Sequence, residues 1–381
     1  MNDLLVNFQS IDILYFENYS VLIVHYYLLT EGCKNIFKFI LTNNSMKKAF
    51  AILSLFLISG SVYSQKIHST NEILKIMSSS KIGYQVKMLD KPVSGIDYSE
   101  KLNLNDSYRI VTDSNITTSP YTVNTKAEPK LQKAEIYFQA KDYENALAAY
   151  KTTLEVDSSL YFIMTYIGQM YEKNRDYQNS IFWYRKAISK NYIDYMAHWF
   201  LADNYITTNN LKNSIDEIVI ARILNRNHRR IKQSMNSIFS KAKRDTTDWY
   251  FNPQIEIKKL SDSTVSVAMD NKWVGYAMAK ALWMYEPGYS ESMGVPKGQH
   301  STLEDRECLL ALIVAQVNAK TKINKDPQLR ILKEAAEKNM LDEYILYEII
   351  LPGNPSFAFQ LSEKMISGIK DYVLNVRNKR N

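Results

Sequence analysis

Glycine, proline and cysteine are all scarce in this sequence. It has 11 glycines and 9 prolines among 381 residues, in both cases under half of average usage. That scarcity argues against a turn-rich all-β sandwich or barrel and against a flexible linker protein. The two cysteines, Cys33 and Cys308, are far apart in the sequence and cannot form a disulfide framework or a cysteine-based zinc site. Tyrosine is abundant instead, with 27 Tyr against 14 Phe and 5 Trp.

The charge and hydrophobic content are those of a packed globular chain. Hydrophobic residues make up 46% of the sequence and charged residues 23%. The 47 basic and 40 acidic residues leave a formal net charge of +7. This excess is small for so long a chain, so we expect no nucleic-acid partner.

A secretory signal begins inside the sequence, at Met46. Lys47 and Lys48 give a positive start, residues 49–60 form an apolar run, and Val62-Tyr63-Ser64 fits a signal peptidase site. We therefore predict a signal peptide at residues 46–64, and we interpret residues 1–45 as an upstream extension from a misassigned start codon. An uncleaved signal anchor is the alternative. The apolar run is shorter than the ~20 residues that span a bilayer.

This segment also predicts where the protein is located. No cysteine stands after the apolar run for acylation, so a lipoprotein is not expected. We expect an exported chain, periplasmic or secreted, with no membrane span in its mature part.

The middle of the sequence repeats with a period of 34 residues. Small residues recur in three columns and an aromatic residue in a fourth, without a gap. The columns are Ala134, Gly168 and Ala202; Tyr137, Tyr171 and Tyr205; Ala146, Ser180 and Ser214; and Thr153, Ala187 and Ala221. Asp142, Asp176 and Asn210 fall at the short turns between helices, where their side chains can cap the second helix. Residues 229–242 give one more amphipathic helix, which we predict to cap the array.

The period and the columns resemble the tetratricopeptide repeat family over about residues 127–228. The family's early tryptophan and closing proline are absent from these positions, which indicates divergent repeats. The resemblance implies an α-solenoid of three helix pairs whose first helices line a concave groove for an extended peptide or a partner helix. It implies a protein or peptide partner and no cofactor.

Carrying the groove positions over by the period gives three sets of residues. They are Leu131, Glu135 and Phe138; Thr165, Gln169 and Glu172; and Trp199, Asp203 and Ile206. The Lys and Asn with which family members hold a peptide carboxylate are absent from these positions, so we expect an apolar or basic segment instead. The alternative is that the repeats serve only as a spacer.

The regions on either side carry weaker signals. Residues 65–126 are polar, with a helical turn near 71–77, a strand at 108–112 and a linker at 113–125. Residues 248–381 predict a smaller α+β unit of unknown function, with a hairpin of strands 254–260 and 264–269. Helices are expected at 272–285, 303–320, 327–339, 342–350 and 357–377. The domains are therefore 127–244 and 248–381.

A basic cluster follows the last repeat, and we interpret it as the solvated outer face of the cap rather than as an anion-binding patch. It comprises Arg222, Arg226, Arg229, Arg230, Lys232, Lys241, Lys243 and Arg244.

A few residues in the C-terminal unit could in principle support catalysis or bind a metal. His300 with Cys308 could act as base and nucleophile, and His300 with Glu304 could bind a metal. Cys308 stands in an apolar helix, where cysteine is usually buried and inert. We therefore expect no catalytic or metal-binding residues, and an exported interaction or scaffolding protein of the cell envelope. An envelope enzyme whose repeats recruit substrate is the alternative.

Overall fold

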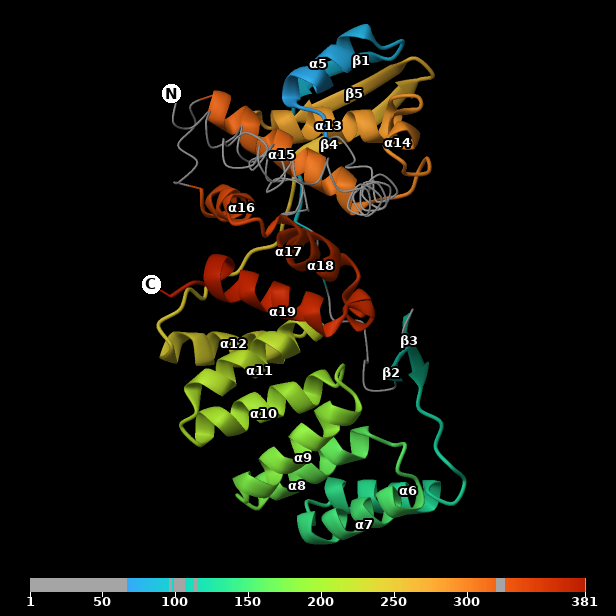
Figure 1. Ribbon diagram of the computed structural model, residues 1–381, viewed down its shortest axis with the longest axis vertical. Helices are drawn as coiled ribbons and strands as arrows, with labels where there is room; N and C mark the ends of the chain where they lie inside the picture. Colours follow the sequence, from blue (N-terminus) through green and yellow to red (C-terminus); the bar gives the residue numbers. More distant parts are fainter. Residues whose placement is uncertain (1–66, 96–97, 99–106, 113–114, 320–325, 381) are drawn as a thin grey trace, which may run out of the picture. The chain divides into compact units, whose positions relative to one another are not determined.

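The computed structural model describes residues 67–95, 98, 107–112, 115–319 and 326–380 (Figure 1). The predicted extension at 1–45 and the signal peptide at 46–64 lie outside the described residues. The chain forms two compact units: residues 70–285 with 300–381, and residues 1–69 with 286–299. In the described part of the chain, no helix is both long and apolar enough to cross a membrane.

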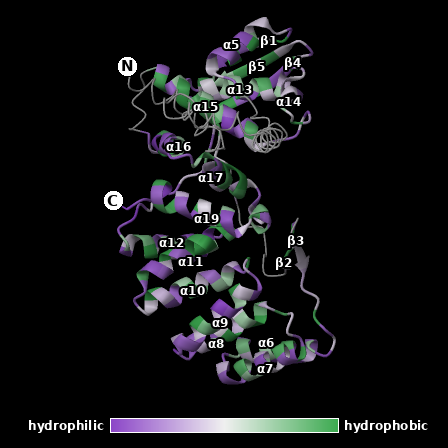
Figure 2. Cartoon of the chain, in the orientation of Figure 1, coloured by the Kyte–Doolittle hydropathy of each residue, from purple (hydrophilic) through white to green (hydrophobic). Residues whose placement is uncertain are grey.

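The middle of the chain is a run of antiparallel helix pairs. The fold class predicted from the period, a mainly helical solenoid joined to a smaller strand-containing part, is confirmed. The helices are α6 (Glu128–Gln139), α7 (Tyr143–Val156), α8 (Phe162–Lys173), α9 (Tyr177–Lys190), α10 (Tyr195–Thr207), α11 (Leu211–Leu224) and the single α12 (Arg229–Lys241). Hydrophilic and hydrophobic residues are interspersed along these helices, as expected for amphipathic helices that pack side by side (Figure 2).

Turns of one geometry join the two helices of each pair. The side chains of Asp142, Asp176 and Asn210 each accept a hydrogen bond from the backbone N–H three residues later. Since the second helix begins just after these residues, the bond satisfies one of its free N–H groups. The predicted caps are therefore confirmed. The residue before each cap has a left-handed backbone, with φ of 60° at Lys141, 60° at Arg175 and 59° at Asn209. One period after Asn209, at the end of α12, Lys243 has the same conformation, with φ of 53°.

These left-handed positions predict a stabilising substitution. A side chain at φ near +60° costs about 1 kcal/mol that glycine avoids. We expect Arg175→Gly to raise the free energy of unfolding in urea by about 0.5 kcal/mol, the gain being reduced by the greater freedom of glycine in the unfolded chain. Gln132→Gly, on an exposed helical turn of α6, is the control and should cost about 1 kcal/mol. Equal losses in both variants would contradict the argument.

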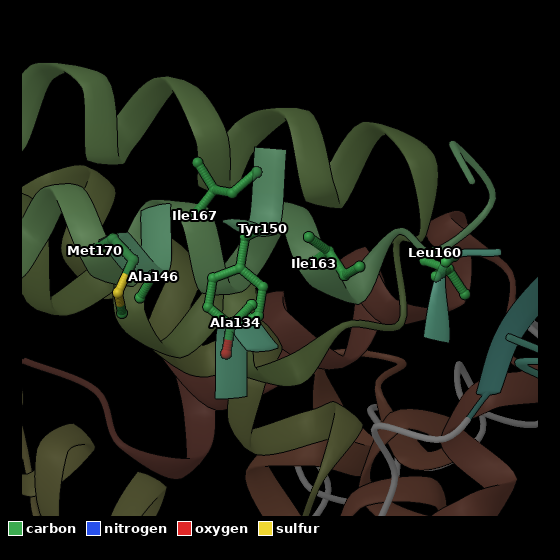
Figure 3. Packing of buried hydrophobic residues seen from close by; sticks show 8 residues of the cluster. Ala134, Ala146, Tyr150, Leu160, Ile163, Ile167 and Met170 are labelled. Atoms are coloured by element: carbon green, nitrogen blue, oxygen red, sulfur yellow. The ribbon is translucent and has the colours of Figure 1, made fainter. Parts of the chain in front are cut away.

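The repeating columns form the core of the solenoid. Ala134, Ala146 and Tyr150 are buried together with Ile163 and Ile167 of the next pair (Figure 3). The small column is required by space, because a Cβ on Gly168 would lie 2.5 Å from a ring carbon of Tyr184. In the first two pairs a small residue of the first helix, Ala134 or Gly168, thus lies where a tyrosine of the second helix, Tyr150 or Tyr184, packs.

A polar contact between neighbouring pairs also follows the period, although the repeat columns did not predict it. Lys151 Nζ donates to the Tyr171 hydroxyl at 2.8 Å, and Arg185 Nε donates to the Tyr205 hydroxyl at 2.8 Å. Each cation also lies over the ring of the same tyrosine. One period later the positions hold Val219 and Phe239, both buried, so α12 is joined to α11 by apolar packing instead.

A three-stranded sheet and its helices adjoin this run within the same compact unit. The sheet has the order β1-β5-β4, and its strands are β1 (Gly83–Met88), β4 (Ile255–Ser261) and β5 (Thr264–Met269). The predicted hairpin is confirmed as the antiparallel pair β4–β5, with Ser261 opposite Thr264, so its loop is one residue shorter than predicted. Strand β1 pairs in parallel with β5. It follows the predicted helical turn, now α5 (Thr70–Ser79), at a place where the sequence analysis predicted no strand.

The predicted linker at 113–125 is wrong for its central part. Residues of β3 (Ile116–Pro120) pair antiparallel with β2 (Ser107–Val111). The hairpin is held to the solenoid by Asn191, whose Oδ1 accepts from Arg109 N–H and whose Nδ2 donates to Ser107 O. The threonines and serine of β3 favoured a linker by composition. The strand forms because residues remote in the sequence, in β2 and at Asn191, stabilise the hairpin.

The C-terminal helices agree with the predicted ranges except the last. They are η2 (Asn271–Trp273), α13 (Val274–Tyr285), α15 (Thr302–Asn318), α16 (Pro327–Glu337), α17 (Leu341–Tyr344), η4 (Ile345–Ile350), α18 (Leu351–Gly353), η5 (Pro355–Gln360), α19 (Glu363–Tyr372) and η6 (Val373–Arg377). A single helix over 357–377 is wrong, because the chain is extended at Leu361 and Ser362, where Ser362 caps α19. Two of these segments, η4 and η6, are π-helical.

The described part of the second unit is small. It contains α14 (Tyr289–Ser292), and the Tyr289 hydroxyl lies 2.8 Å from His68 Nδ1 of the same unit.

Candidate partner-binding groove

The first helices of the pairs, α6, α8 and α10, carry all nine candidate groove residues. Eight of the nine are half-buried: Leu131, Glu135, Phe138, Gln169, Glu172, Trp199, Asp203 and Ile206. The ninth, Thr165, is 2% exposed, and its hydroxyl donates to Asp194 Oδ2 at 2.6 Å. Thr165 thus joins α8 to the capped start of α10 and presents no surface to a partner.

The candidate acids are oriented by tyrosines of the second helices. Glu135 accepts a hydrogen bond from the Tyr150 hydroxyl at 2.8 Å, and Glu172 accepts one from the Tyr184 hydroxyl at 2.8 Å. Glu172 also accepts from Asn204 Nδ2 at 3.0 Å, which joins α8 to α10. The carboxylates are therefore fixed in position rather than free to rotate.

Trp199 and Asp203 lie one turn apart on α10. Trp199 stacks on Phe200 with ring centroids 5.0 Å apart, and its Nε1 donates to Ser234 Oγ of α12 at 2.8 Å. Burial, together with the nearby charge of Glu172, raises the pKa of Asp203 to about 7. The structure thus brings Glu172 of α8 together with Trp199 and Asp203 of α10, and Ser234 of α12 bonds to Trp199.

The residues of α6 form a separate part of the surface. Leu131 and Glu135 line a shallow depression together with four further residues, Val123, Glu128, Gln132 and Ile136. Ile136 is 65% exposed. Phe138 packs against the core and lies 6.5 Å from the Tyr143 ring, centroid to centroid. The first repeat therefore offers exposed apolar surface flanked by two carboxylates.

Sequence reasoning missed Ser234, Asn204 and Ile136. Ser234 could have been found by extending the 34-residue period from Phe200 into α12. Asn204 could not, because a buried amide between two helices has no local sequence signature. Ile136 stands outside the family columns and is recognised only by its exposure.

The raised pKa of Asp203 predicts a pH-dependent stability. Between the unfolded value of 3.8 and the folded value of about 7, the unfolded chain has released its proton while the folded chain still holds it. The stability contributed by this group is therefore greatest at low pH and is lost as the pH rises through that window. We expect Asp203→Asn to remove this loss, so that the variant equals the wild type near pH 4 and gains about 1–3 kcal/mol in the free energy of unfolding at pH 8.

Urea unfolding at a series of pH values checks this. Asp262→Asn is the matched control, since the Asp262 side chain is fully exposed, and it should give no gain at pH 8. A pH-independent difference between Asp203→Asn and wild type would show that Asp203 is ionised in the folded protein throughout the range.

The residues of the catalytic alternative form separate pairs. His300 Nε2 lies 2.9 Å from Asp305 Oδ2, whereas Glu304 accepts from Lys280 Nζ. Cys308 is completely buried, and burial raises the pKa of its thiol well above the ordinary value, which opposes formation of a nucleophilic thiolate. Among the described residues, no group of His, Cys, Asp and Glu side chains is arranged to hold a metal ion.

Known proteins match this chain through its repeats. The family model for the tetratricopeptide repeat matches residues 127–159 and 165–189. No curated protein sequence matches the chain.

Several solved structures are similar to parts of the chain. The TPR2B domain of yeast Sti1, in its pHsp70 complex, is 20% identical, with 31% of this chain and 99% of that chain covered and a TM-score of 0.30. The Yersinia enterocolitica type III secretion chaperone SycD, in complex with a peptide of the translocator YopD, is 15% identical, with 31% and 96% covered and a TM-score of 0.30. A tetratricopeptide repeat protein from Parabacteroides merdae is 10% identical, with 66% and 100% covered and a TM-score of 0.25.

These identities and TM-scores are low, so the assignment rests on the family match and on the repeated helix geometry. The caps and left-handed turns at one spacing extend that geometry through α11 and α12, beyond the matched residues. The chain contains tetratricopeptide repeats, which the family model matches at residues 127–159 and 165–189.

Proposed function

We propose that the repeats bind a segment of a partner protein that carries basic and apolar side chains. The observation that carries this proposal is the arrangement of Glu172 and Asp203 beside Trp199. A carboxyl group held partly protonated by burial and a like charge favours a cationic neighbour, because a cation restores its ionised form. The stacked indole beside it supplies the apolar surface on which binding energy concentrates.

The α6 surface supports the same kind of partner. Leu131 and the exposed Ile136 are apolar, while Glu128 and Glu135 at their sides are acidic. A segment with alternating basic and apolar side chains would satisfy both parts of the groove. Repeats acting only as a spacer would need no such acidic and apolar surface.

Binding of synthetic peptides tests the proposal. Peptides that combine Arg or Lys with Leu or Phe should bind the purified protein, and their affinity should fall with added salt. Peptides ending in an acidic run, which suit a carboxylate-binding groove, should not bind.

Variants locate the binding surface. Trp199→Ala combined with Phe138→Ala should weaken peptide binding by about tenfold or more. Phe182→Ala is the control, because Phe182 is 57% exposed on α9, a second helix. Equal binding by the double variant and the control would refute binding in the groove.

We further propose that this interaction takes place outside the cytoplasm, in the cell envelope. The support is the sequence alone: Lys47-Lys48, the apolar run 49–60 and the site at Ser64. Mass spectrometry of the mature protein should find Gln65 as its first residue. A mature chain that retains residues 46–64 would contradict cleavage.

A further inference from the structure

The last repeat ends in two completely buried arginines. Arg222 is 2% exposed and Arg226 is 1% exposed. The interpretation of this basic cluster as a solvated outer face is therefore wrong for both residues, although Arg229, Arg230, Lys241 and Lys243 are exposed. Helix α11 and the residues that follow it contact η4 and α19: Arg226 bonds to Tyr347 O and to Glu348, and Asp216 forms an ion pair with Lys370.

The acceptors around these arginines are already used. Glu348 Oε2 pairs with Arg226 Nη2 at 3.3 Å, and Glu348 Oε1 accepts from Arg377 Nε at 2.9 Å and from the Tyr372 hydroxyl at 3.0 Å. The other nearby carboxylate, Asp248, pairs with Lys232 and lies 3.8 Å from Arg377 Nη2. Neither carboxylate forms a hydrogen bond or ion pair with Arg222, on which Asp248 acts only through its charge.

Several buried donors in the same segments have no acceptor in the described part of the chain. Arg222 Nη1 donates to the His228 carbonyl at 3.4 Å and to no other atom of the described residues. Among the described residues no hydrogen-bond partner lies near Arg222 Nη2 or Arg226 Nη1, nor near two further buried donors, Asn225 Nδ2 and Trp249 Nε1. Trp249 belongs to the same cluster, because the Arg377 guanidinium lies 4.2 Å from its ring centre.

The charges in this cluster do not balance. Three buried guanidinium groups, those of Arg222, Arg226 and Arg377, share the two carboxylates of Glu348 and Asp248, and Asp248 also pairs with Lys232. A guanidinium does not lose its proton in a protein, so Arg222 cannot relieve the excess by becoming neutral. A buried charge with free donors is costly unless an anion or polar group pairs with it.

We infer that Arg222 and Arg226 bind one compact inorganic anion at the end of the repeat array, with Arg222 Nη2 and Arg226 Nη1 as donors. Both guanidinium groups interact with the same three residues, Tyr250, Tyr347 and Asp248, which places them in one neighbourhood. The planar fork of arginine suits an oxyanion such as phosphate, and the free N–H groups also suit chloride. The anion would stabilise the junction between α11 and the C-terminal helices and is independent of the peptide groove.

Thermal unfolding of the full chain at constant ionic strength tests the inference. The protein is dialysed into a buffer whose only anion is large, such as gluconate with a zwitterionic buffer. Sodium phosphate or sodium chloride then replaces the bulky salt in separate series. We expect the unfolding temperature to rise by about 3–6 °C in one series, increasing with the logarithm of the anion concentration. The series that responds identifies the anion.

Arg222→Met separates a specific site from a general salt effect. Phosphate stabilises many proteins by exclusion from their surface, so only the difference between variants is informative. Arg222→Met should lose the anion-dependent rise, while Arg230→Met, at an exposed position nearby, should keep it. Because Arg222 makes a single long hydrogen bond, its loss should leave the chain folded; should it not fold, calorimetric titration of phosphate and chloride into the wild type decides. The inference is overturned by a wild type that responds to neither anion, by an equal rise in Arg222→Met, or by titrations that show no binding.

Discussion

Replacing Glu348 by Gln should lower the free energy of unfolding by about 3–5 kcal/mol, one of the two largest effects expected for a single substitution in this chain. The Glu348 carboxylate is completely enclosed, with 0% of its side chain exposed, and pairs with Arg226 and Arg377. Glutamine keeps the shape but removes the charge. Two buried guanidinium groups would then face each other with Asp248 as their nearest remaining carboxylate.

Urea unfolding of Glu348→Gln against Glu337→Gln measures this effect. Glu337 makes the same kind of ion pair, with Lys333, but its side chain is 55% exposed, so its loss should cost less than about 0.5 kcal/mol. A Glu348→Gln variant as stable as the Glu337→Gln control would mean that the buried pairs are not formed in solution. The comparison also bears on the anion site, because added phosphate should offset more of the loss in Glu348→Gln than in the control.

Replacing Gly275 by Ala should cost more than about 3 kcal/mol and disrupt the packing of α13 on α15. A Cβ on Gly275 would lie 2.1 Å from the Ala311 carbonyl oxygen and 2.9 Å from the Ala315 Cβ. The first of these atoms belongs to the backbone of a helix, so no side-chain rotation can relieve the clash and the two helices must separate. The helix propensity gained by alanine, about 1 kcal/mol, is too small to compensate.

Gly353→Ala is the matched control for this substitution. Gly353 also lies in a helix, α18, and a Cβ there would meet nothing within 4 Å. The control should be neutral or slightly more stable than the wild type. The near-ultraviolet circular dichroism of Trp273, Tyr276 and Trp283, all buried in η2 and α13, should be reduced in Gly275→Ala. Retention of both the signal and the stability would contradict the close packing.

Local structure could be predicted from the sequence, because its causes lie within a few residues. The cap at Asp142 is a hydrogen bond to the backbone three residues later, and it recurs at Asp176 and Asn210 with the period. The β4–β5 hairpin depends on a short turn between two apolar strands, so it too has a local signal. The last predicted helix was wrong because the extended residues Leu361 and Ser362 interrupt an otherwise periodic apolar pattern without a proline or glycine.

Only part of the candidate groove could be predicted from the sequence. The period placed Glu172, Trp199 and Asp203 on the first helices, but the contacts of Trp199 with Ser234 and of Glu172 with Asn204 depend on how those helices pack. Thr165 occupies a groove position by the period, yet its hydroxyl bonds to the buried Asp194. Position in a repeat therefore predicts a helix face and leaves the exposure of each side chain to the neighbouring repeat.

The sequence by itself determined the repeat: its period, the small and aromatic columns, and the capped turns, all of which follow from short-range geometry and from the size of the side chains that must interlock. Only the tertiary structure decided which segments far apart in the sequence contact one another. It paired Gly83–Met88 with a strand that begins at Thr264, folded residues 116–120 against residues 107–111 and Asn191, and enclosed Arg222 and Arg226 under the C-terminal helices. The physical reason is that a strand pairing or a buried ion pair is stabilised by partners far away in the chain, whose identity no local pattern contains.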